Sequence, residues 1–274
     1  PICAVPGTVV EQDNVAGHIS DGVDAVLHLA AKNAGDCAAD PEGAHIVNVL
    51  STGKLLAAAE KAGVQRFIHV STAHVYGAPL RGKISEQTVP RPVHPYSITH
   101  RAAEELVLAS GISGLVLRLS NAMGAPADPA ADCWMLLSNE LCRQAVTKGE
   151  LALRGTGLER RDFIPLSDVA SAVDHFLGLP AEAWGNGLFN VGSGRSRSSY
   201  EMAGLIADRC ATVLGFAPPI RRAAPLGQDT GTDLHYCNDK LLATGFRLHG
   251  DEGAEIEATL NLCRVAFAAK ATTG

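Results

Sequence analysis

The chain has 274 residues, 46% of them hydrophobic, and a formal net charge of −6 at pH 7. A chain of this length can bury a large core, as one large domain or two smaller ones, and its mixed composition is typical of soluble globular proteins. The acidic balance provides no basic field for nucleic acid or for an anionic membrane, so the sequence disfavours both partners.

The apolar stretches and the cysteines narrow the class of protein further. The longest apolar stretches, such as residues 23–31, contain polar residues and are much shorter than a membrane span, and no positively charged leader with an apolar core is recognisable. The seven cysteines form no CxxC pair, which favours reduced and buried thiols over a disulfide framework or a metal site. We therefore expect a cytoplasmic protein without a bound metal.

Apolar runs alternate along the chain with alanine-rich segments of helical spacing. We predict strands at residues 8–12, 25–31, 66–72, 114–120, 162–166 and 188–192. We predict helices at about 42–62, 95–110, 134–148 and 167–178, and a further helix, capped by Ser198 or Ser199, through residue 210. Several strands are apolar throughout, as in a sheet that is covered on both faces. The alternation predicts an α/β fold with a doubly wound parallel sheet.

Loops that contain proline and glycine interrupt this alternation from about residue 122 onward. The interruption suggests a second, smaller part of the chain. We therefore divide the chain into a sheet domain of residues 1–121 and 162–192 and a smaller C-terminal lobe of residues 122–161 and 193–274.

Two short segments contain side chains suited to proton transfer. Residues 71–77 (STAHVYG) place Thr72 at the end of an apolar strand, and residues 95–100 (PYSITH) place Tyr96 at the start of a helix. His100 follows Tyr96 by four residues and therefore shares its helix face. A phenol beside a hydroxyl and a potential cation can move protons next to a carbonyl or an alcohol.

This arrangement resembles the extended short-chain dehydrogenase/reductase family, the NAD-dependent epimerases and dehydratases of nucleotide sugars. The resemblance runs from residue 23 to residue 246 and implies a Rossmann-like dinucleotide-binding domain, an NAD or NADP cofactor and a substrate-binding lobe. It also implies that Thr72, Tyr96 and His100 form the catalytic set, with His100 where the family carries a lysine.

The resemblance assigns a set of positions to the cofactor. A turn of small residues after the strand at 25–31 would lie against the pyrophosphate, and an aspartate after residues 8–12 would lie near the adenine. An asparagine of the following helix and the tyrosine–histidine pair would complete the site. The implied cofactor-binding residues are Asp13, Leu29, Ala30, Ala31, Asn48, Tyr96 and His100.

For the substrate, the resemblance points to His74, Asn121 and Arg161. Asn121 lies in LRLSNAMG, like an asparagine of the family at the substrate phosphate, and Arg161 lies in RRDFIPLSDVA, at a position that often reaches substrate phosphate. His74 replaces the acid–base carboxylates of the family's dehydratases, which argues against dehydration. His28 and His69 lie within apolar strands and are expected to be hydrogen-bonded core histidines.

Two departures from the family concern phosphate binding. No GxxGxxG turn follows a strand, and we interpret Gly155–Gly157 and Gly192–Gly194 as hairpin turns. Because the family's turn holds the cofactor pyrophosphate at a helix N-terminus, we expect an upstream segment of about 50–60 residues, the size of two strand–helix units. The second phosphate-binding arginine of the family is also missing from PLGQDTGTD, where Arg221 and Arg222 are nearby substitutes.

The replacement of lysine by His100 leaves two functions open, because a neutral imidazole helps a tyrosine to ionise much less than an ammonium group does. The first is an NAD(P)-dependent oxidoreductase or epimerase of a sugar-like alcohol, with a nucleotide sugar as the expected substrate. The second is a degenerate family member that binds a nucleotide or nucleotide sugar without turnover. The resemblance also implies a homodimer, paired through the helices at 42–62 and 95–110.

Overall fold

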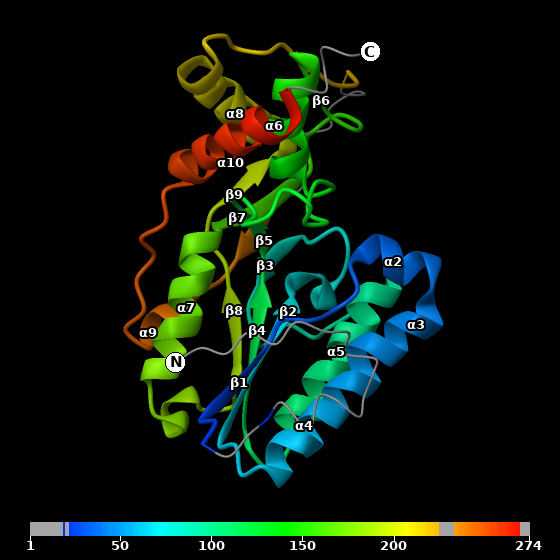
Figure 1. Ribbon diagram of the computed structural model, residues 1–274, viewed down its shortest axis with the longest axis vertical. Coiled ribbons are helices and arrows are strands. Elements are labelled where there is room, and N and C mark those ends of the chain that lie inside the picture. The colour runs from blue at the N-terminus through cyan, green and yellow to red at the C-terminus, as the bar shows by residue number, and fades with distance from the viewer. Residues whose placement is uncertain (1–18, 20–21, 225–232, 269–274) are drawn as a thin grey trace. The chain divides into compact units, whose positions relative to one another are not determined.

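The computed structural model describes residue 19, residues 22–224 and residues 233–268 (Figure 1). The contacts between residues divide the chain into two units. The sheet unit comprises residues 1–79, 85–119 and 174–190, and the lobe unit comprises residues 80–84, 120–173 and 191–274. The lobe unit thus includes residues 162–173, which the sequence pattern groups with the sheet domain.

The sheet unit is built on a four-stranded sheet with the order β1-β2-β4-β8. The strands are β1 (Ala25–His28), β2 (Arg66–Thr72), β4 (Ser113–Leu119) and β8 (Leu188–Val191). β2 runs parallel to both β1 and β4, with His28 opposite His69 and Thr72 opposite Leu119. The predicted α/β fold with a parallel, Rossmann-like sheet is confirmed. The predicted strand at residues 8–12 lies outside the described residues.

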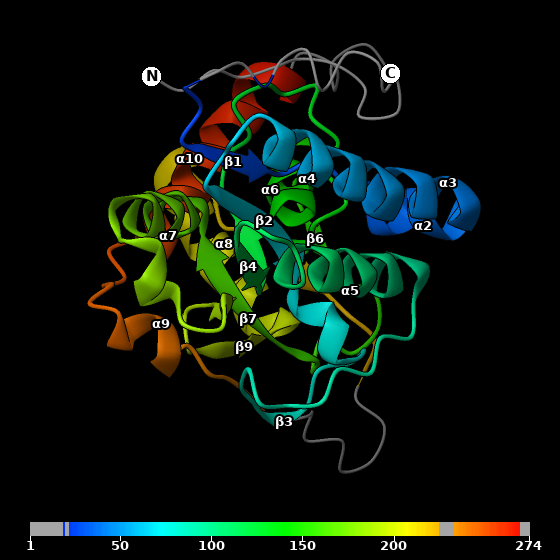
Figure 2. The same cartoon turned by 90° about the horizontal axis from the view of Figure 1, so that it is seen from below.

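Helices cover both faces of this sheet. Figure 2 shows α4 (Ser51–Lys61) and α5 (Pro95–Leu108) on one face and, on the other, the end of α7 (Leu166–Gly178), whose residues 174–178 belong to the sheet unit. Phe67 of β2 and Val116 of β4 are fully buried in an apolar cluster with residues of α4 and α5. Gly114 permits the close approach of α5 to β4, because a Cβ atom there would lie 2.3 Å from the carbonyl oxygen of Val107.

The helix predicted at about 42–62 is interrupted in the structure. It consists of α3 (Pro41–His45), a π-helical turn η1 (Ile46–Leu50) and α4, and the short helix α2 (Ala34–Ala39) precedes it. Asp40 caps α3 by accepting a hydrogen bond from the backbone of Gly43. A π turn inside a helix is uncommon and is frequent at functional sites. This turn contains Asn48, which the sequence places at the cofactor.

The lobe unit contains three small sheets. The largest joins β5 (Asn121–Met123), β7 (Arg160–Pro165) and β9 (Ser196–Ser198); the others join β6 (Leu151–Ala152) to β10 (Ile220–Arg221) and β3 (Gly82–Ile84) to β11 (Leu234–Tyr236). The interpretation of Gly155–Gly157 and Gly192–Gly194 as hairpin turns is wrong. Each of these turns connects strands that belong to different sheets, so its flanking strands do not pair with each other.

Three helices form the core of the lobe unit, at the top of Figure 1: α6 (Leu137–Lys148), α8 (Ser199–Leu214) and α10 (Glu252–Phe267). The cap predicted for α8 is present, because the Ser198 side chain accepts from the backbone of Glu201 and the Glu201 carboxylate accepts from the backbone of Ser198. The remaining helical elements are η2 (Ala73–Tyr76), η3 (Ala181–Trp184) and α9 (Asp239–Ala243).

The cysteines of the lobe core behave as small apolar side chains. Cys142, Cys210 and Cys263 pack between α6, α8 and α10. Burial raises the pKa of Cys210 to about 11 and that of Cys263 to about 12, so these thiols carry almost no thiolate at neutral pH. The prediction of buried thiols is confirmed for these three residues.

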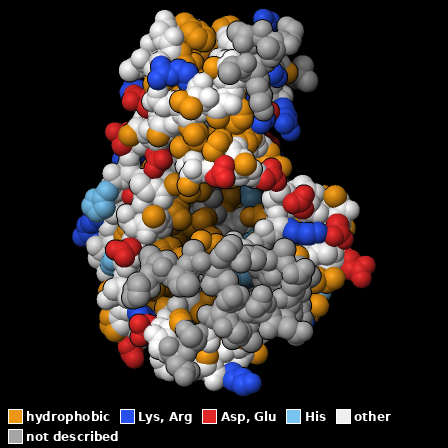
Figure 3. All heavy atoms as spheres, viewed as in Figure 1, with side chains coloured by type: hydrophobic (Ala, Val, Ile, Leu, Met, Phe, Trp, Pro, Cys, Tyr) orange, Lys and Arg blue, Asp and Glu red, His pale blue; other side chains and the backbone are white. Residues whose placement is uncertain are grey.

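Two further findings concern the described residues as a whole. None of their helices combines the length and the apolar composition that crossing a membrane requires. On the face drawn in Figure 3, acidic and basic side chains are interspersed, and the described residues form no continuous basic patch there.

Candidate functional site

Tyr96 is presented by the first turn of α5. The backbone of His94 is extended, and the His94 side chain accepts a hydrogen bond from the backbone N–H of Tyr96. In return, the Ser97 hydroxyl oxygen accepts a hydrogen bond from the backbone N–H of His94, which completes a capping box. Pro95 at the first helical position needs no hydrogen-bond partner for its nitrogen. These contacts fix where α5 begins and therefore fix the position of the Tyr96 backbone.

Thr72 is the last residue of β2 and is buried. Its hydroxyl oxygen accepts a hydrogen bond of 3.2 Å from the backbone of His74, which begins the turn η2. Burial raises the pKa of Tyr96 above its usual value, and a hydrogen bond with the Thr72 side chain opposes that rise. The structure therefore brings together the hydroxyl and the phenol that the sequence predicts as partners.

His100 lies against Tyr96, one helical turn further along α5. The two ring centroids are 4.4 Å apart in an edge-to-face arrangement, and the His100 side chain is only 4% exposed. Both ring nitrogens are shielded from solvent and lack a hydrogen-bond partner among the described residues. Burial lowers the pKa of His100 to about 4, although Glu104 opposes the shift, so the imidazole is neutral at pH 7.

His100 is one of three histidines whose rings form a row. The ring centroids of His69 and His100 are 6.0 Å apart, and those of His28 and His69 are 5.4 Å apart on adjacent strands. His28 is hydrogen-bonded, as expected, through Nε2 to the Thr52 hydroxyl at 2.9 Å. His69 is not, because neither of its buried nitrogens has a partner. The expectation of a hydrogen-bonded core histidine is wrong for His69.

The tautomer of His28 follows from its neighbours. Thr52 donates its single hydroxyl hydrogen to the carbonyl oxygen of Asn48 at 2.8 Å. The contact with His28 must then use the Thr52 oxygen as acceptor, so His28 donates from Nε2. Burial lowers the pKa of His28 to about 4, which keeps the ring neutral and this arrangement in place at pH 7.

Asn48 connects the turn after β1 to the helix that carries Tyr96. Its Oδ1 accepts a hydrogen bond of 2.8 Å from the backbone of Lys32, and its Nδ2 donates to the Thr99 hydroxyl at 3.0 Å. The adjoining residues Leu29, Ala30 and Ala31 are exposed at the carboxyl end of β1. Ligands of open α/β sheets bind at the carboxyl ends of strands, so this turn is placed as a cofactor contact requires.

A buried ion pair that the sequence analysis missed supports this region. Arg118 of β4 makes two hydrogen bonds to Glu104 of α5, of 2.9 and 2.6 Å, and Ser71 donates to the same carboxylate at 2.6 Å. Both charged side chains are almost completely buried. The sequence does contain a signal for this ion pair: Arg118 lies within an apolar strand, and a buried guanidinium requires a buried acid.

The remaining predicted site residues differ in their surroundings. His74 is exposed directly after the β2 strand end. Asn121 of β5 donates to the carbonyl oxygen of Asp162 on β7, at 3.0 Å. Asp13 lies outside the described residues. The structure of the described residues thus groups Thr72, Tyr96 and His100 in the sheet unit, whereas Asn121 and Arg161 belong to the lobe unit.

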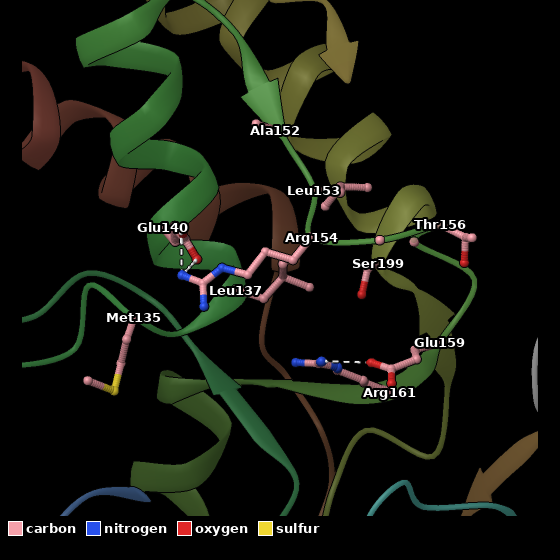
Figure 4. A pocket seen from close by; sticks show the side chains of 12 residues that line it. Met135, Leu137, Glu140, Ala152, Leu153, Arg154, Thr156, Glu159, Arg161 and Ser199 are labelled. Carbon is pink, nitrogen blue, oxygen red and sulfur yellow. Dashed lines mark hydrogen bonds and ion pairs between the residues drawn. The ribbon is translucent and has the colours of Figure 1, made fainter. Parts of the chain in front are cut away.

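Arg161 lines a pocket of about 380 Å³ within the lobe unit (Figure 4). Its other walls come from the start of α6, from residues 152–157 and from Ser199. Figure 4 shows Arg154 paired with Glu140 and Arg161 paired with Glu159. The sequence analysis recognised Arg161 and missed its three charged neighbours: Glu140 lies on α6, and Arg154 and Glu159 lie in the loop between β6 and β7.

Arg221 and Arg222, the suggested substitutes for a second phosphate-binding arginine, have other partners. The Arg222 guanidinium lies 3.8 Å from the centre of the Tyr200 ring and donates to the carbonyl oxygen of Thr156 at 3.0 Å. Arg221 pairs with Glu150. Arg222 therefore supports the Gly155–Gly157 turn that forms one wall of the pocket, whereas Arg154 is the second arginine that lines it.

The chemistry available to the sheet unit is proton transfer. Tyr96 supplies a phenol and Thr72 a hydroxyl at the carboxyl edge of a parallel sheet, beside an exposed turn of small residues. Across the described residues, no three side chains of His, Cys, Asp or Glu converge in a way that would hold a metal ion. His100 occupies the lysine position in sequence, and both of its ring nitrogens are shielded from solvent.

Comparison of the sequence with known families finds one match that spans most of the chain. The model of the family described as "NAD dependent epimerase/dehydratase family" matches residues 3–192. An uncharacterized UDP-glucose epimerase of Bacillus subtilis (strain 168), YtcB, is 30% identical over 196 residues, which are 69% of this chain and 59% of that protein. The chain therefore spans less than two thirds of the length of this relative.

Other relatives differ in their named activities. A GDP-6-deoxy-D-mannose reductase of Pseudomonas aeruginosa is 30% identical over 214 residues, which are 73% of this chain and 67% of the reductase. A UDP-glucose 4-epimerase of Thermus thermophilus, solved with NAD, has a TM-score of 0.76 and 25% identity, with 95% of this chain and 84% of that chain covered. The structure of RMD from Pseudomonas aeruginosa with NADPH has a TM-score of 0.78 at 24% identity, with coverage of 97% and 90%.

Proposed function

Because the chain belongs to the NAD dependent epimerase/dehydratase family, we propose that it is an NAD(P)-dependent oxidoreductase or epimerase that acts on a sugar-like alcohol of a nucleotide sugar. The main support for this proposal is the pairing of Thr72 with Tyr96 at the carboxyl end of β2. A half-buried phenol beside a hydroxyl, at the sheet edge where dinucleotides bind, is suited to proton transfer to or from a substrate oxygen.

The cofactor would be NAD or NADP, held in part by the exposed turn of Leu29, Ala30 and Ala31. Asn48 holds the end of this turn through the backbone of Lys32 and so keeps the turn in register with α5. When bound, the nicotinamide supplies the hydride acceptor and donor of the reaction. Asp13 remains the proposed contact near the adenine.

In the proposed mechanism, Thr72 holds the substrate hydroxyl oxygen and Tyr96, in its phenolate form, removes the hydroxyl proton. The Tyr96 oxygen accepts the proton as the carbon–oxygen bond gains carbonyl character, and it returns the proton when the carbonyl is reduced. Epimerisation would require the carbonyl to be held, turned and reduced again in the same site. Because burial raises the pKa of Tyr96 and His100 is neutral, the protein's own side chains give this phenolate little stabilisation at pH 7.

The nucleotide sugar is the proposed substrate because phosphate-binding side chains line the lobe pocket. Arg161 and Arg154 offer guanidinium groups, which bind phosphate oxygens in a bidentate manner. Asn121 and His74 remain proposed substrate contacts, and the lobe unit as a whole is proposed to bind the substrate while the sheet unit binds the cofactor. The names of the related epimerases and of the reductase include UDP- and GDP-linked sugars, which supports this substrate class.

We propose a homodimer formed through η1 and α5. Large apolar side chains are exposed on these elements: Leu50, Ile98 and Leu106. Exposed apolar residues grouped on neighbouring helices are typical of a helix-pairing surface. The cytoplasmic location stays a prediction.

The second candidate function is nucleotide or nucleotide-sugar binding without turnover. The neutral, shielded His100 favours it, because the position that supplies a cation in the family has no charge here at pH 7. The discriminating experiment incubates the protein with NAD or NADP and a panel of UDP-, GDP- and dTDP-sugars, and it measures the reduced nicotinamide or the epimeric sugar formed. We expect turnover with at least one sugar and its loss in Tyr96→Phe, with cofactor binding retained. Cofactor binding without any turnover would support the binding function.

A further inference from the structure

The pocket of the lobe unit has a wall whose charges cancel. Two arginines and two glutamates are the charged residues among the described side chains that line it. Arg161 Nη2 lies 3.0 Å from Glu159 Oε2, and Arg154 Nη2 lies 3.2 Å from Glu140 Oε1. Each guanidinium that faces the pocket is therefore held by a carboxylate of the same wall (Figure 4).

These ion pairs are exposed and therefore weak. The side chains of Arg161 and Glu159 are 39% and 61% exposed, and those of Arg154 and Glu140 are 85% and 21% exposed. Exposed pairs contribute little because water screens the charges and long side chains lose freedom. A phosphate group makes shorter, bidentate bonds to a guanidinium, so it can displace either glutamate.

The displaced carboxylates stay near the bound anion. Glu159 is two residues from Arg161 on the same chain segment, and Glu140 is fixed on α6 beside the pocket. Each remaining negative charge then repels the ligand, and the repulsion grows with the negative charge on the ligand. The glutamates consequently reduce the extra attraction that a more highly charged anion would otherwise gain from the two arginines.

We propose that Glu140 and Glu159 are specificity-determining residues, which hold the two pocket arginines in the ligand-free protein and select diphosphate diesters over diphosphate monoesters. The proposal rests on the proposed function in taking this pocket as the site of a nucleotide sugar. A nucleotide sugar is a diester. A free nucleoside diphosphate carries about one more negative charge at neutral pH, because its terminal phosphate has a second ionisation near pH 6. The two glutamates thus favour the intact substrate over the free nucleotide.

The test compares the affinities of matched probes for the wild-type protein and for Glu140→Gln, Glu159→Gln and the double variant. The probes are UDP with UDP-glucose, GDP with GDP-mannose, dTDP with dTDP-glucose, and inorganic pyrophosphate, each titrated by calorimetry without added cofactor. Glutamine keeps the size and a hydrogen-bonding group of glutamate but removes its charge. We expect each single change to strengthen monoester binding by about threefold and diester binding by less, so that the preference for the diester falls.

Repeating the titrations at several ionic strengths separates an effect of charge on affinity from an effect of a changed pocket shape. The affinity of the double variant for pyrophosphate should fall more steeply with ionic strength than that of the wild type, because its pocket wall carries two uncompensated arginines. The matched control is Glu257→Gln, which removes an exposed ion pair with Arg209 outside the pocket and should leave every affinity unchanged. Thermal unfolding of each variant checks that the fold is retained.

Two outcomes would overturn the proposal: an unchanged preference between monoester and diester in the double variant, or no binding of any probe by any of the proteins. The measurement does not depend on hydride transfer. A protein that binds the probes in this charge-dependent way but never reduces a cofactor would contradict the proposed function and leave this inference standing.

Discussion

The acidity of Tyr96 depends on a few neighbouring atoms. Burial raises the pKa of its phenol, the Thr72 side chain opposes that rise, and the adjoining His100 ring is neutral at pH 7. Bringing a phenol pKa from about 10 to 7 takes about 4 kcal/mol of differential stabilisation of the phenolate. A neutral imidazole in edge contact supplies little of this, whereas an ammonium group would supply much of it.

We predict that His100→Lys raises turnover and shifts the pH optimum downward. The new ammonium would lie one helical turn from Tyr96 and would stabilise its phenolate, while the wild-type protein should be most active at alkaline pH. The measurement is the pH–rate profile of both proteins on the best substrate found, with Tyr96→Phe as the control that nearly abolishes turnover. An inert or slower His100→Lys, together with full activity of Tyr96→Phe, would remove the catalytic assignment.

Individual functional residues can be predicted from the sequence where they belong to a short local motif. Thr72 and Tyr96 were recognisable because a strand end and a helix start carry them at a characteristic spacing. The partners of Arg118 and Arg161 were not recognisable in this way. Glu104 lies 14 residues from Arg118, and Glu159 reads as one charge of a solvated patch until the pocket beside it is known.

At the scale of elements, β1, β2 and α5 together bury a row of three histidines. Burial lowers the pKa of His28 and of His100 to about 4, and it lowers that of His69 well below the usual value, with repulsion from the other two rings adding to the effect. All three rings are neutral in the folded protein at pH 7. Protonating any of them in the folded protein is unfavourable, because the charge would have to be buried.

We predict that the free energy of unfolding falls as the pH falls from about 6.5 towards 4. The unfolded chain binds protons on these histidines below a pH of about 6.5, whereas in the folded protein the pKa of His28 and of His100 is about 4 and that of His69 is well below its usual value. Acid therefore favours unfolding, by about 1–2 kcal/mol at pH 5 for each of His28 and His100. His69→Phe should raise stability at pH 7 and reduce its loss at pH 5, because the buried nitrogens of His69 have no partner. Urea unfolding at both pH values measures this. His235→Gln is the exposed control, and an equal pH dependence of the wild type and His69→Phe would contradict the prediction.

The apolar surface on η1 and α5 yields a prediction about assembly. Ile98→Glu and Leu50→Glu should convert the proposed dimer to a monomer, because each places a charge in a helix-pairing surface. Sedimentation velocity at micromolar concentration measures the change. Val265→Glu on α10 is the control, since Val265 is an exposed apolar residue of the lobe unit. A monomeric wild-type protein would contradict the proposal.

Element positions follow the sequence closely where periodicity is strong. β2 covers the predicted residues 66–72, and α5 begins at the predicted residue 95. The π turn η1 was not foreseen, because its apolar spacing resembles that of an α-helix and its distinguishing contact, from Asn48 to the turn after β1, is tertiary. The turn at Gly155–Gly157 was misassigned because glycine spacing indicates a turn without indicating which strands pair.

For the whole molecule, the sequence predicts that the chain has two parts more clearly than it predicts the boundaries between them. The resemblance covers both units, and the family match spans residues 3–192. The contacts nevertheless place residues 162–173 with the lobe, because β7 pairs with β5 and β9. β7 leads into α7, which begins in the lobe unit and passes into the sheet unit at residue 174, and no local feature of the sequence marks that boundary.

We propose that this chain uses Tyr96 to pass a proton while a hydride moves to a nicotinamide. The most direct measurement supplies a nucleotide sugar carrying deuterium at the oxidised carbon and detects, by mass spectrometry, deuterium transferred to NAD or NADP in a single turnover. We expect transfer by the wild-type protein and little or none by Tyr96→Phe, with the cofactor bound equally by both. Bound cofactor and bound sugar without deuterium transfer, or equal transfer by Tyr96→Phe, would contradict it.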